Sequence, residues 1–323
     1  MINTGESPSK GTINDDFIRL LEGREAGLFF YSPYSFLREI DQTDLCRTTF
    51  TYPIKNEILA GRLSVSVEDI DGLKTWFVWK TPAWDSDYFR RKVVRIEFIL
   101  PDHKSPEVAG LAISKFAKQL AGAGGYISVN IPCEDLLLIR SMSYSCFRLV
   151  ETRLNYYFNG FGQVSAPEDP VRMAVPEDIP ALKEVAMKMR NRFDRVHADP
   201  AFSDDIADAY LGRFIEESVK GFADMVMVPD IKGVKPFGFL AADHPVETMG
   251  LRIAKLVLAA ADNSHYKGWL SKLLSAVIFE LKKKNTDILT TITQAANRPA
   301  IRTWEKAGFR LGFVTHLYSY HND

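Results

Sequence analysis

The stretch that decides the fold is Asp287–Phe309, DILTTITQAANRPAIRTWEKAGF, near the end of the chain. Its first part, Asp287–Gln294, is rich in isoleucine, leucine and threonine, which predicts a β-strand. Pro299 suits the first turn of a helix, the apolar residues after it recur at helical spacing, and Gly308 suits the helix end. A strand, a short loop, a short helix and a return to apolar, β-rich sequence predict an α/β fold.

Length and composition indicate an ordinary globular protein. The chain has 323 residues, which favours about two domains. Hydrophobic residues make up 46% of it and charged residues 25%, which permits a sizeable core. The formal charge is -1, from 40 basic and 41 acidic residues, and this balance argues against a nucleic-acid or acidic-membrane surface.

Cysteine usage and the N-terminus favour the cytoplasm. Cys46, Cys133 and Cys146 have no metal-ligand spacing, and so sparse a set fits reduced thiols. We therefore expect no metal site. No apolar run approaches the ~20 residues of a membrane span, and the polar start of the chain lacks the apolar segment of a signal peptide.

Two layered halves are expected from the hydrophobic pattern, with the boundary in the glycine- and proline-rich segment 159–170. The first half alternates strands and helices, at 93–99, 108–120, 126–131, 134–142 and 147–158. The second half predicts helices at 182–189, 203–219 and 269–281, and strands at 225–228, 237–242 and 254–261. Residues 1–75 match no pattern, and within them we expect short strands at 48–54 and 63–67.

Four stretches resemble the GNAT acyltransferase superfamily, and in particular sugar-nucleotide N-acetyltransferases of the dTDP-fucosamine acetyltransferase type. They are the segments WDSDYF at 84–89, NRF with HADPAF between 191 and 202, the strand and helix at 254–272, and the stretch from Gln294 to Phe309. The resemblance implies tandem GNAT-like modules with mixed central sheets flanked by helices. It gives an N-terminal extension at 1–75, a degenerate module at 76–160 and an acyltransferase module at 171–323, and it leaves a homodimer open.

In such proteins two parallel strands splay apart and the pantetheine arm of an acyl-CoA enters the gap. The resemblance places that strand at 256–261 and the cofactor on its residues Leu258, Ala259, Ala260 and Ala261. Orphan N–H groups and the dipole at a helix start favour anions, so Lys267, Gly268 and Trp269 are expected at the diphosphate. The loop departs from the family pattern, because His265 and Leu270 replace an Arg or Gln and a small residue.

The usual acid of the superfamily, a tyrosine four residues before the Gly-Phe step, is replaced by Trp304. An indole N–H donates a hydrogen bond but is not a useful acid. The resemblance implies that Asn297 and Trp304 contact the cofactor. Trp304 as plain core packing is the alternative.

Other residues are candidates for catalysis and for acceptor binding. Tyr318 and Tyr320 share one face of the last strand and are candidate acids, with a plain surface or rim position as the alternative for each. His197 is the candidate base because imidazole titrates near neutrality; a structural turn contact is the alternative. Arg192 suits a phosphate or a solvated salt bridge, and Phe193 and His321 are further candidate substrate contacts.

The expected function is N-acyl transfer from acetyl-CoA, or another acyl-CoA, to a primary amine, with an amino sugar on a nucleotide carrier as the expected acceptor. Two alternatives stay open. A catalytically impaired module that only binds acyl-CoA or another ligand is suggested by the departures at Leu270 and Trp304. An enzyme acting on an amino acid or peptide amine is the other, since a fold does not name its substrate.

Overall fold

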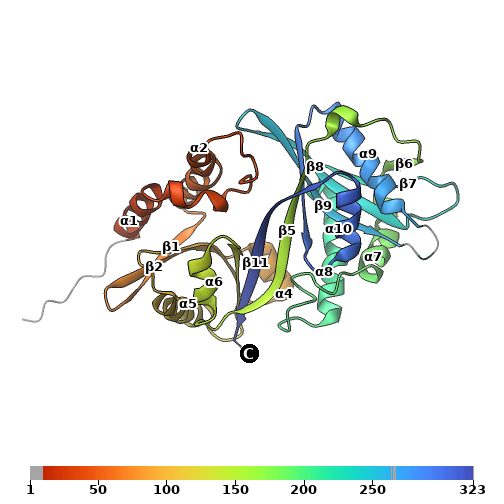
Figure 1. Cartoon of the computed structure of the whole chain (residues 1–323). Coiled ribbons are helices and arrows are strands. Elements are labelled where there is room, and N and C mark those ends of the chain that lie inside the picture. The colour runs from red at the N-terminus through yellow and green to blue at the C-terminus, as the bar shows by residue number, and fades with distance from the viewer. Residues whose placement is uncertain (1–9, 263, 265–266, 323) are drawn as a thin grey trace, which may run out of the picture. The chain divides into compact units, whose positions relative to one another are not determined.

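A computed structural model describes residues 10–262, 264 and 267–322 (Figure 1). Contacts divide the chain into two compact units: unit 1 runs up to Val150 and resumes at Phe313, and unit 2 is Glu151–Gly312. The division falls inside strands β5 (Arg148–Phe158) and β11 (Arg310–His321), whereas the sequence placed it at 159–170. The end of β11 falls in unit 1 because it pairs there with β4 (Tyr126–Pro132).

The strands of unit 1 lie in the sheet in the order β1-β2-β3-β4-β11. The pair β3–β4 is parallel and the other pairs are antiparallel. The remaining strands are β1 (Ser64–Ile70), β2 (Leu73–Lys80) and β3 (Val93–Pro101). The helical elements are α1 (Lys10–Glu22), η1 (Glu25–Gly27), η2 (Phe29–Tyr31), α2 (Gln42–Cys46), η3 (Arg47–Thr51), α3 (Tyr52–Leu59), α4 (Ala83–Phe89), α5 (Pro106–Ala121) and α6 (Leu136–Met142).

Two apolar clusters cover the two faces of this sheet. Helices α5 and α6 contribute Ile113, Phe116 and Leu138 to a cluster with residues of β2, β3 and β4. The N-terminal helices contribute Phe17 and Phe50 to the other cluster, which includes Phe98 and Leu100 of β3. Buried residues between Phe17 and Leu63 are therefore part of the unit 1 core.

The expected strand at 48–54 is wrong, because this segment is helical in η3 and α3. Its threonines and aromatic residues favour strands in isolation. Phe50, Ile54 and Ile58 recur every four residues, however, and all three are buried in the same core cluster. Tertiary packing of this face overrides the local preference.

The strands of unit 2 lie in the sheet in the order β5-β10-β9-β8-β7-β6. Its strands are β6 (Val171–Met173), β7 (Met225–Pro229), β8 (Gly238–Thr248), β9 (Leu251–Ala261) and β10 (Ile288–Gln294), with most of β5. Its helical elements are η4 (Phe161–Gln163), η5 (Pro176–Asp178), α7 (Ile179–Lys188), α8 (Asp204–Glu217), η6 (Ser218–Phe222), α9 (Trp269–Lys283) and α10 (Arg298–Lys306). The helices expected near 182, 203, 269 and 299 are thus confirmed.

Helices α9 and α10 pack on one face of the unit 2 sheet, in a cluster with Leu240, Leu256 and Leu289. Helices α7 and α8 pack in another cluster with Val226, Phe239 and other residues of β7, β8 and β9. Antiparallel pairs flank the single parallel pair β9–β10. The layered α/β architecture expected from the sequence is confirmed. No described helix is both long and apolar enough to cross a membrane.

Candidate functional site

The parallel strands β9 and β10 pair over only three residues before they separate. The ladder joins Ile288 to Ile253, Leu289 to Ala254 and Thr290 to Lys255, and it ends there. From Leu256 and Thr291 onward, the two strands form no further pairs with each other. A gap between them therefore opens toward the carboxyl ends of both strands, at the segment expected from the sequence.

The separation has a local cause in β9. Ala242 pairs with Leu256 and Ala241 with Leu258, so Val257 is an extra residue, a β-bulge, at the point where the gap begins. A bulge bends its strand and increases the local twist. Beyond it, β9 stays paired with β8 up to Ala261, and β10 stays paired with β5 up to Gln294. Each strand is held by its outer neighbour while the inner edges part.

The inner edges of the gap offer backbone hydrogen-bonding groups that no strand pairing uses. Unpaired N–H and C=O groups are costly to bury, so they require a polar partner. A ligand with amide groups along an extended arm would supply that partner. The side chains of Ala259, Ala260 and Ala261 are small, which permits such a ligand to approach the backbone closely.

Helix α9 begins next to the gap without a side-chain cap from the described residues, a feature that it shares with α3, α4 and α7. Its N-cap is Gly268, at φ 80°. Helices α5, α8 and α10 are instead capped by Ser105, Ser203 and Asn297. The exposed Lys267 precedes Gly268, whereas His265 lies outside the described residues. Free N–H groups, the helix dipole and a lysine together can hold an anion.

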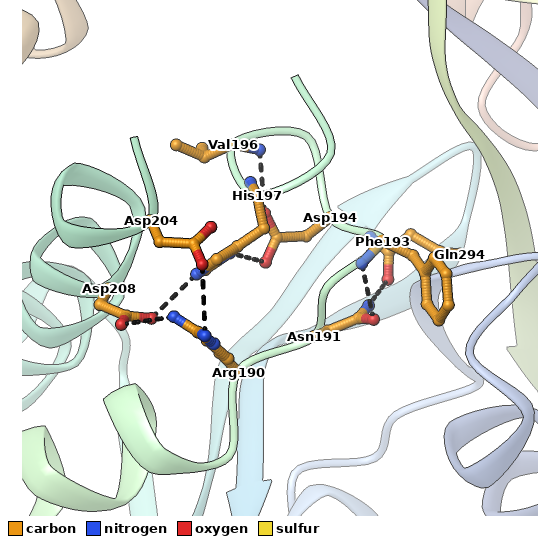
Figure 2. Close-up of polar contacts among 9 residues, drawn as sticks. All are labelled: Arg190, Asn191, Phe193, Asp194, Val196, His197, Asp204, Asp208 and Gln294. Atoms are coloured by element: carbon orange, nitrogen blue, oxygen red, sulfur yellow. Dashed lines mark hydrogen bonds and ion pairs between the residues drawn. The ribbon is translucent and has the colours of Figure 1, made fainter. Parts of the chain in front are cut away.

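The end of α7 and the segment after it contact the ends of both gap strands, and Figure 2 shows the contact between Asn191 and Gln294. The Lys188 ammonium lies 2.5 Å from the carboxylate of Asp262, which directly follows β9. The Asn191 amide nitrogen donates to the side-chain oxygen of Gln294, the last residue of β10. Hydrogen bonds from Lys188 and then Ser264 hold the pKa of the Asp262 carboxyl well below its usual range. This carboxylate is therefore a tether and not a base near neutral pH.

His197 lies in a polar cluster beside this segment (Figure 2). Its Nδ1 is 2.8 Å from Asp194 and its Nε2 is 3.0 Å from Asp208. Its side chain is 2% exposed. Arg190 reaches Asp208 at 2.8 Å and also contacts Asp204. With both ring nitrogens bound to carboxylates, the imidazole fixes the loop between α7 and α8 against α8.

Trp304 is buried beside the gap strand with an unpaired donor. Its side chain is 4% exposed and belongs to the same apolar cluster as Leu256, with Ala259 and Leu270 packed against that cluster. Its Nε1–H finds no acceptor among the described residues. A buried donor without a hydrogen bond costs about 1–3 kcal/mol of stability. The Nε1–H of Trp304 would therefore be stabilised by an acceptor.

The other cofactor candidates have clear structural partners. Asn297 caps α10, where its Oδ1 accepts from the Ala300 N–H at 3.3 Å. Trp269 is buried and packs edge-on against Phe237 at a centroid distance of 5.4 Å. These contacts fix the starts of α9 and α10, the helices that follow the two sides of the gap.

Tyr156 of β5 is a buried tyrosine in the same apolar cluster as Trp304, and it contacts helix α10. Its hydroxyl donates to Glu305 at 3.0 Å. Burial, followed by the hydrogen bond and charge of Glu305, raises the pKa of Tyr156 to about 12. The phenol therefore stays protonated and serves as a fixed donor to α10.

The remaining candidates divide between the two units. Tyr318 is part of the apolar core of unit 1 and Tyr320 packs against it. Burial raises the pKa of Tyr318. His321 ends β11 in the same unit. Arg192 and Phe193 belong to unit 2 and are exposed, directly after Asn191, which contacts Gln294 at the end of β10.

Sequence reasoning missed the residues that close the gap and fix its loop. No motif marks these residues, which are Lys188, Asp262, Asp194 and Asp208. Their hydrogen-bond partners are distant in sequence or are brought close by a turn. The only available signal was Gln294 at the end of a predicted strand.

Searches against models of protein families and against curated proteins find no match. Solved structures do resemble the chain. A GCN5-related N-acetyltransferase from Sphaerobacter thermophilus aligns with 13% identity and a TM-score of 0.54, covering 93% of each chain. A GNAT-family acetyltransferase from Colwellia psychrerythraea aligns with 12% identity and a TM-score of 0.46, covering 95% of this chain and 97% of the other. The first of these likenesses shows a shared fold across both units.

Replacing His197 by Asn separates a structural role from a catalytic one. We expect the free energy of unfolding to fall by about 1–3 kcal/mol, because Asp194 and Asp208 lose a buried partner. Urea unfolding measures this loss. Any turnover of the folded variant at saturating substrate should stay within a few-fold of the wild type. An undiminished stability with a hundredfold lower turnover would instead make His197 a base.

Proposed function

We propose that unit 2 is an N-acyltransferase that moves an acyl group from an acyl-CoA to a primary amine. The observation that carries this proposal is the parallel pair β9–β10, which stops after three residues beside a helix that begins without a side-chain cap. The fold shared with a GCN5-related N-acetyltransferase supports it. Acetyl-CoA is the simplest donor.

The proposed donor site matches each part of an acyl-CoA to a part of the gap. The pantetheine arm carries amides and pairs with the free edge of Leu256–Ala261. The diphosphate binds the first amides of α9, with Lys267 as a point charge beside it. Gly268 suits this position because its positive φ, 80°, turns the chain tightly into the helix.

Acyl transfer requires a neutral amine, an electrophilic thioester carbon and stabilisation of the negative charge that develops on the oxygen and the sulfur. The neutral amine attacks the thioester carbonyl carbon, and a tetrahedral oxyanion forms. Backbone N–H groups of β9 beyond the Val257 bulge are the proposed oxyanion donors. The ammonium proton passes to solvent water, the C–S bond breaks, and CoA leaves as the thiolate, which then takes a proton from water.

Trp304 takes the place of an acid in this proposal. Its orphan Nε1–H donates to the acyl-CoA at the thioester end, so the buried donor gains the partner that the protein does not give it. It lowers the charge on the leaving group through a hydrogen bond and transfers no proton. We assign no proton transfer to Tyr318 or Tyr320, because they pack in the apolar core of unit 1. We assign none to His197, because its ring is bound to carboxylates.

For the acceptor we propose an amino sugar on a nucleotide carrier. The support is the exposed pair that follows Asn191: the Arg192 guanidinium suits a phosphate and the Phe193 ring, 49% exposed, suits a sugar or base face. An amino acid or peptide amine is the competing acceptor class.

A second candidate function is a module that binds acyl-CoA without turnover. It is favoured by the tryptophan in place of an acid at Trp304 and by the bulky Leu270 in the first turn of α9. The next experiment separates the two.

Thiol release from acetyl-CoA over a panel of amines tests the proposal. We expect turnover with nucleotide-linked amino sugars, and Arg192→Gln should raise their KM roughly tenfold while leaving KM for free amino sugars unchanged, since it removes a phosphate contact. Binding of acetyl-CoA with no turnover on any amine supports the second candidate. Absence of both binding and turnover contradicts the donor site itself.

Lys267→Gln tests the anion end of the gap. We expect CoA to bind about five- to tenfold more weakly, because one charge contact to phosphate is lost. Binding of pantetheine, which lacks the diphosphate, should not change. Calorimetry measures both affinities. Lys284→Gln, at the other end of the same helix, is the matched control. Equal losses of CoA affinity in the two variants would refute the assignment of Lys267 to the diphosphate.

Trp304→Phe and Trp304→Tyr test the orphan donor. Loss of the N–H in the Phe variant should weaken acetyl-CoA binding about tenfold, near 1.4 kcal/mol for one hydrogen bond. The Tyr variant restores a donor and should recover part of the affinity. Unfolding curves control for the smaller side chains. If all three proteins bind acetyl-CoA equally, Trp304 is core packing only.

A further inference from the structure

Unit 1 repeats the splayed strand pair of unit 2. The parallel strands β3 and β4 pair from Val93 to Ile96 and then stop. As in β9, a bulge sits where the pairing ends: Trp79 pairs with Ile96 and Val78 with Phe98, so Glu97 is the extra residue. Unit 1 therefore contains a second gap, at residues 97–101 of β3.

The helix that follows this second gap cannot hold a diphosphate in the same way. Ser105 caps α5, and its hydroxyl accepts from the Val108 N–H at 3.3 Å. Pro106 occupies the first turn and has no N–H to offer. Glu107 adds a negative charge there, with its carboxylate 3.0 Å from the Ser105 hydroxyl. An anion at this helix start would meet a cap and a like charge.

The N-terminal helices cover the open end of the gap. The Arg24 guanidinium donates to the backbone oxygens of Pro101 at 2.6 Å and Asp102 at 3.2 Å, where β3 ends. Tyr31 packs on Phe98 at a centroid distance of 4.7 Å, and its hydroxyl donates to Asp135 at 2.7 Å, just beyond β4. One tyrosine thus spans the distance between the two strands.

A pocket of about 430 Å³ remains under this cover. Its apolar lining includes Leu28, Phe30, Leu100 and Leu137, and its charged lining residues are Arg24 and Asp135. The volume lies within the usual range for small-molecule sites.

The two charged residues of the pocket, Arg24 and Asp135, differ in how many hydrogen-bonding groups remain for a ligand. Asp135 is already satisfied, because its oxygens accept from the Leu138 N–H at 3.0 Å and from the Tyr31 hydroxyl. Burial and then the Asp135 charge raise the pKa of Tyr31 well above its usual value, so this hydroxyl stays a donor. Arg24 uses two N–H groups on backbone oxygens, and a guanidinium has five.

We propose that unit 1 binds a small apolar carboxylate in this pocket, with the hydrocarbon part against Leu28, Leu100 and Leu137 and the carboxylate at Arg24. The site uses the space of the second gap without a diphosphate site. It is independent of the acyl transfer proposed for unit 2, and either proposal can fail alone.

The test compares three probes with the same eight-carbon chain in the full-length protein: octanoate, octanol and octylamine, titrated by calorimetry. We expect octanoate to bind more tightly than octanol, and octylamine to bind most weakly. Arg24→Gln should weaken octanoate about tenfold and leave octanol unchanged, while Arg24→Lys should restore part of the difference. Octylamine as the tightest probe would refute the role of Arg24.

Gly27→Phe locates the site. Gly27 lines the pocket in η1, and a Cβ there meets no atom within 4 Å, so the ring can fill the space without a backbone clash. The matched control is Gly162→Phe in η4, where a Cβ also meets nothing within 4 Å. Octanoate affinity should fall at least twentyfold in the first variant only. Unchanged affinity in Gly27→Phe, or no octanoate binding to the wild type, would overturn the proposal.

Discussion

The hydrogen bonds of strand β9 are the constraint on which the candidate site depends. On one edge, β9 is paired with β8 as far as Ala261. On the other edge its ladder with β10 ends at Lys255. The remaining backbone groups of that edge need a partner, and water or an amide-bearing ligand can supply it. Three features lie along or beside this edge: the bulge at Val257, the small residues after it, and the start of α9.

The two units build similar gaps and differ in what closes them. Both have a bulge at the end of a short parallel ladder, at Glu97 in unit 1 and Val257 in unit 2. In unit 1 the following helix is capped by Ser105, and Tyr31 reaches across the gap. In unit 2 the helix starts at Gly268 without a side-chain cap. A few residues at the helix start and over the gap therefore separate a candidate diphosphate site from a pocket with a largely apolar lining.

The sequence predicted the elements whose signals are local. The strand and helix of Asp287–Phe309 follow from β-propensity, proline and helical spacing, and the helix over 269–281 follows from its amphipathic spacing. The failures involve long-range contacts. The segment 48–54 becomes helical because its apolar face packs on β3, and the carboxylates that fix His197 carry no spacing that marks them. Only tertiary pairing brings Asn191 to Gln294.

The most direct test of the central claim is amide hydrogen exchange with and without acetyl-CoA. If the pantetheine arm pairs with the free edge of β9, exchange should slow at least tenfold for amides within Leu256–Ala261 and in the first turn of α9. The amides of residues 97–100 in β3 should not change. Acetyl-CoA that binds without slowing any amide of Leu256–Ala261, or that slows residues 97–100 instead, would contradict the account.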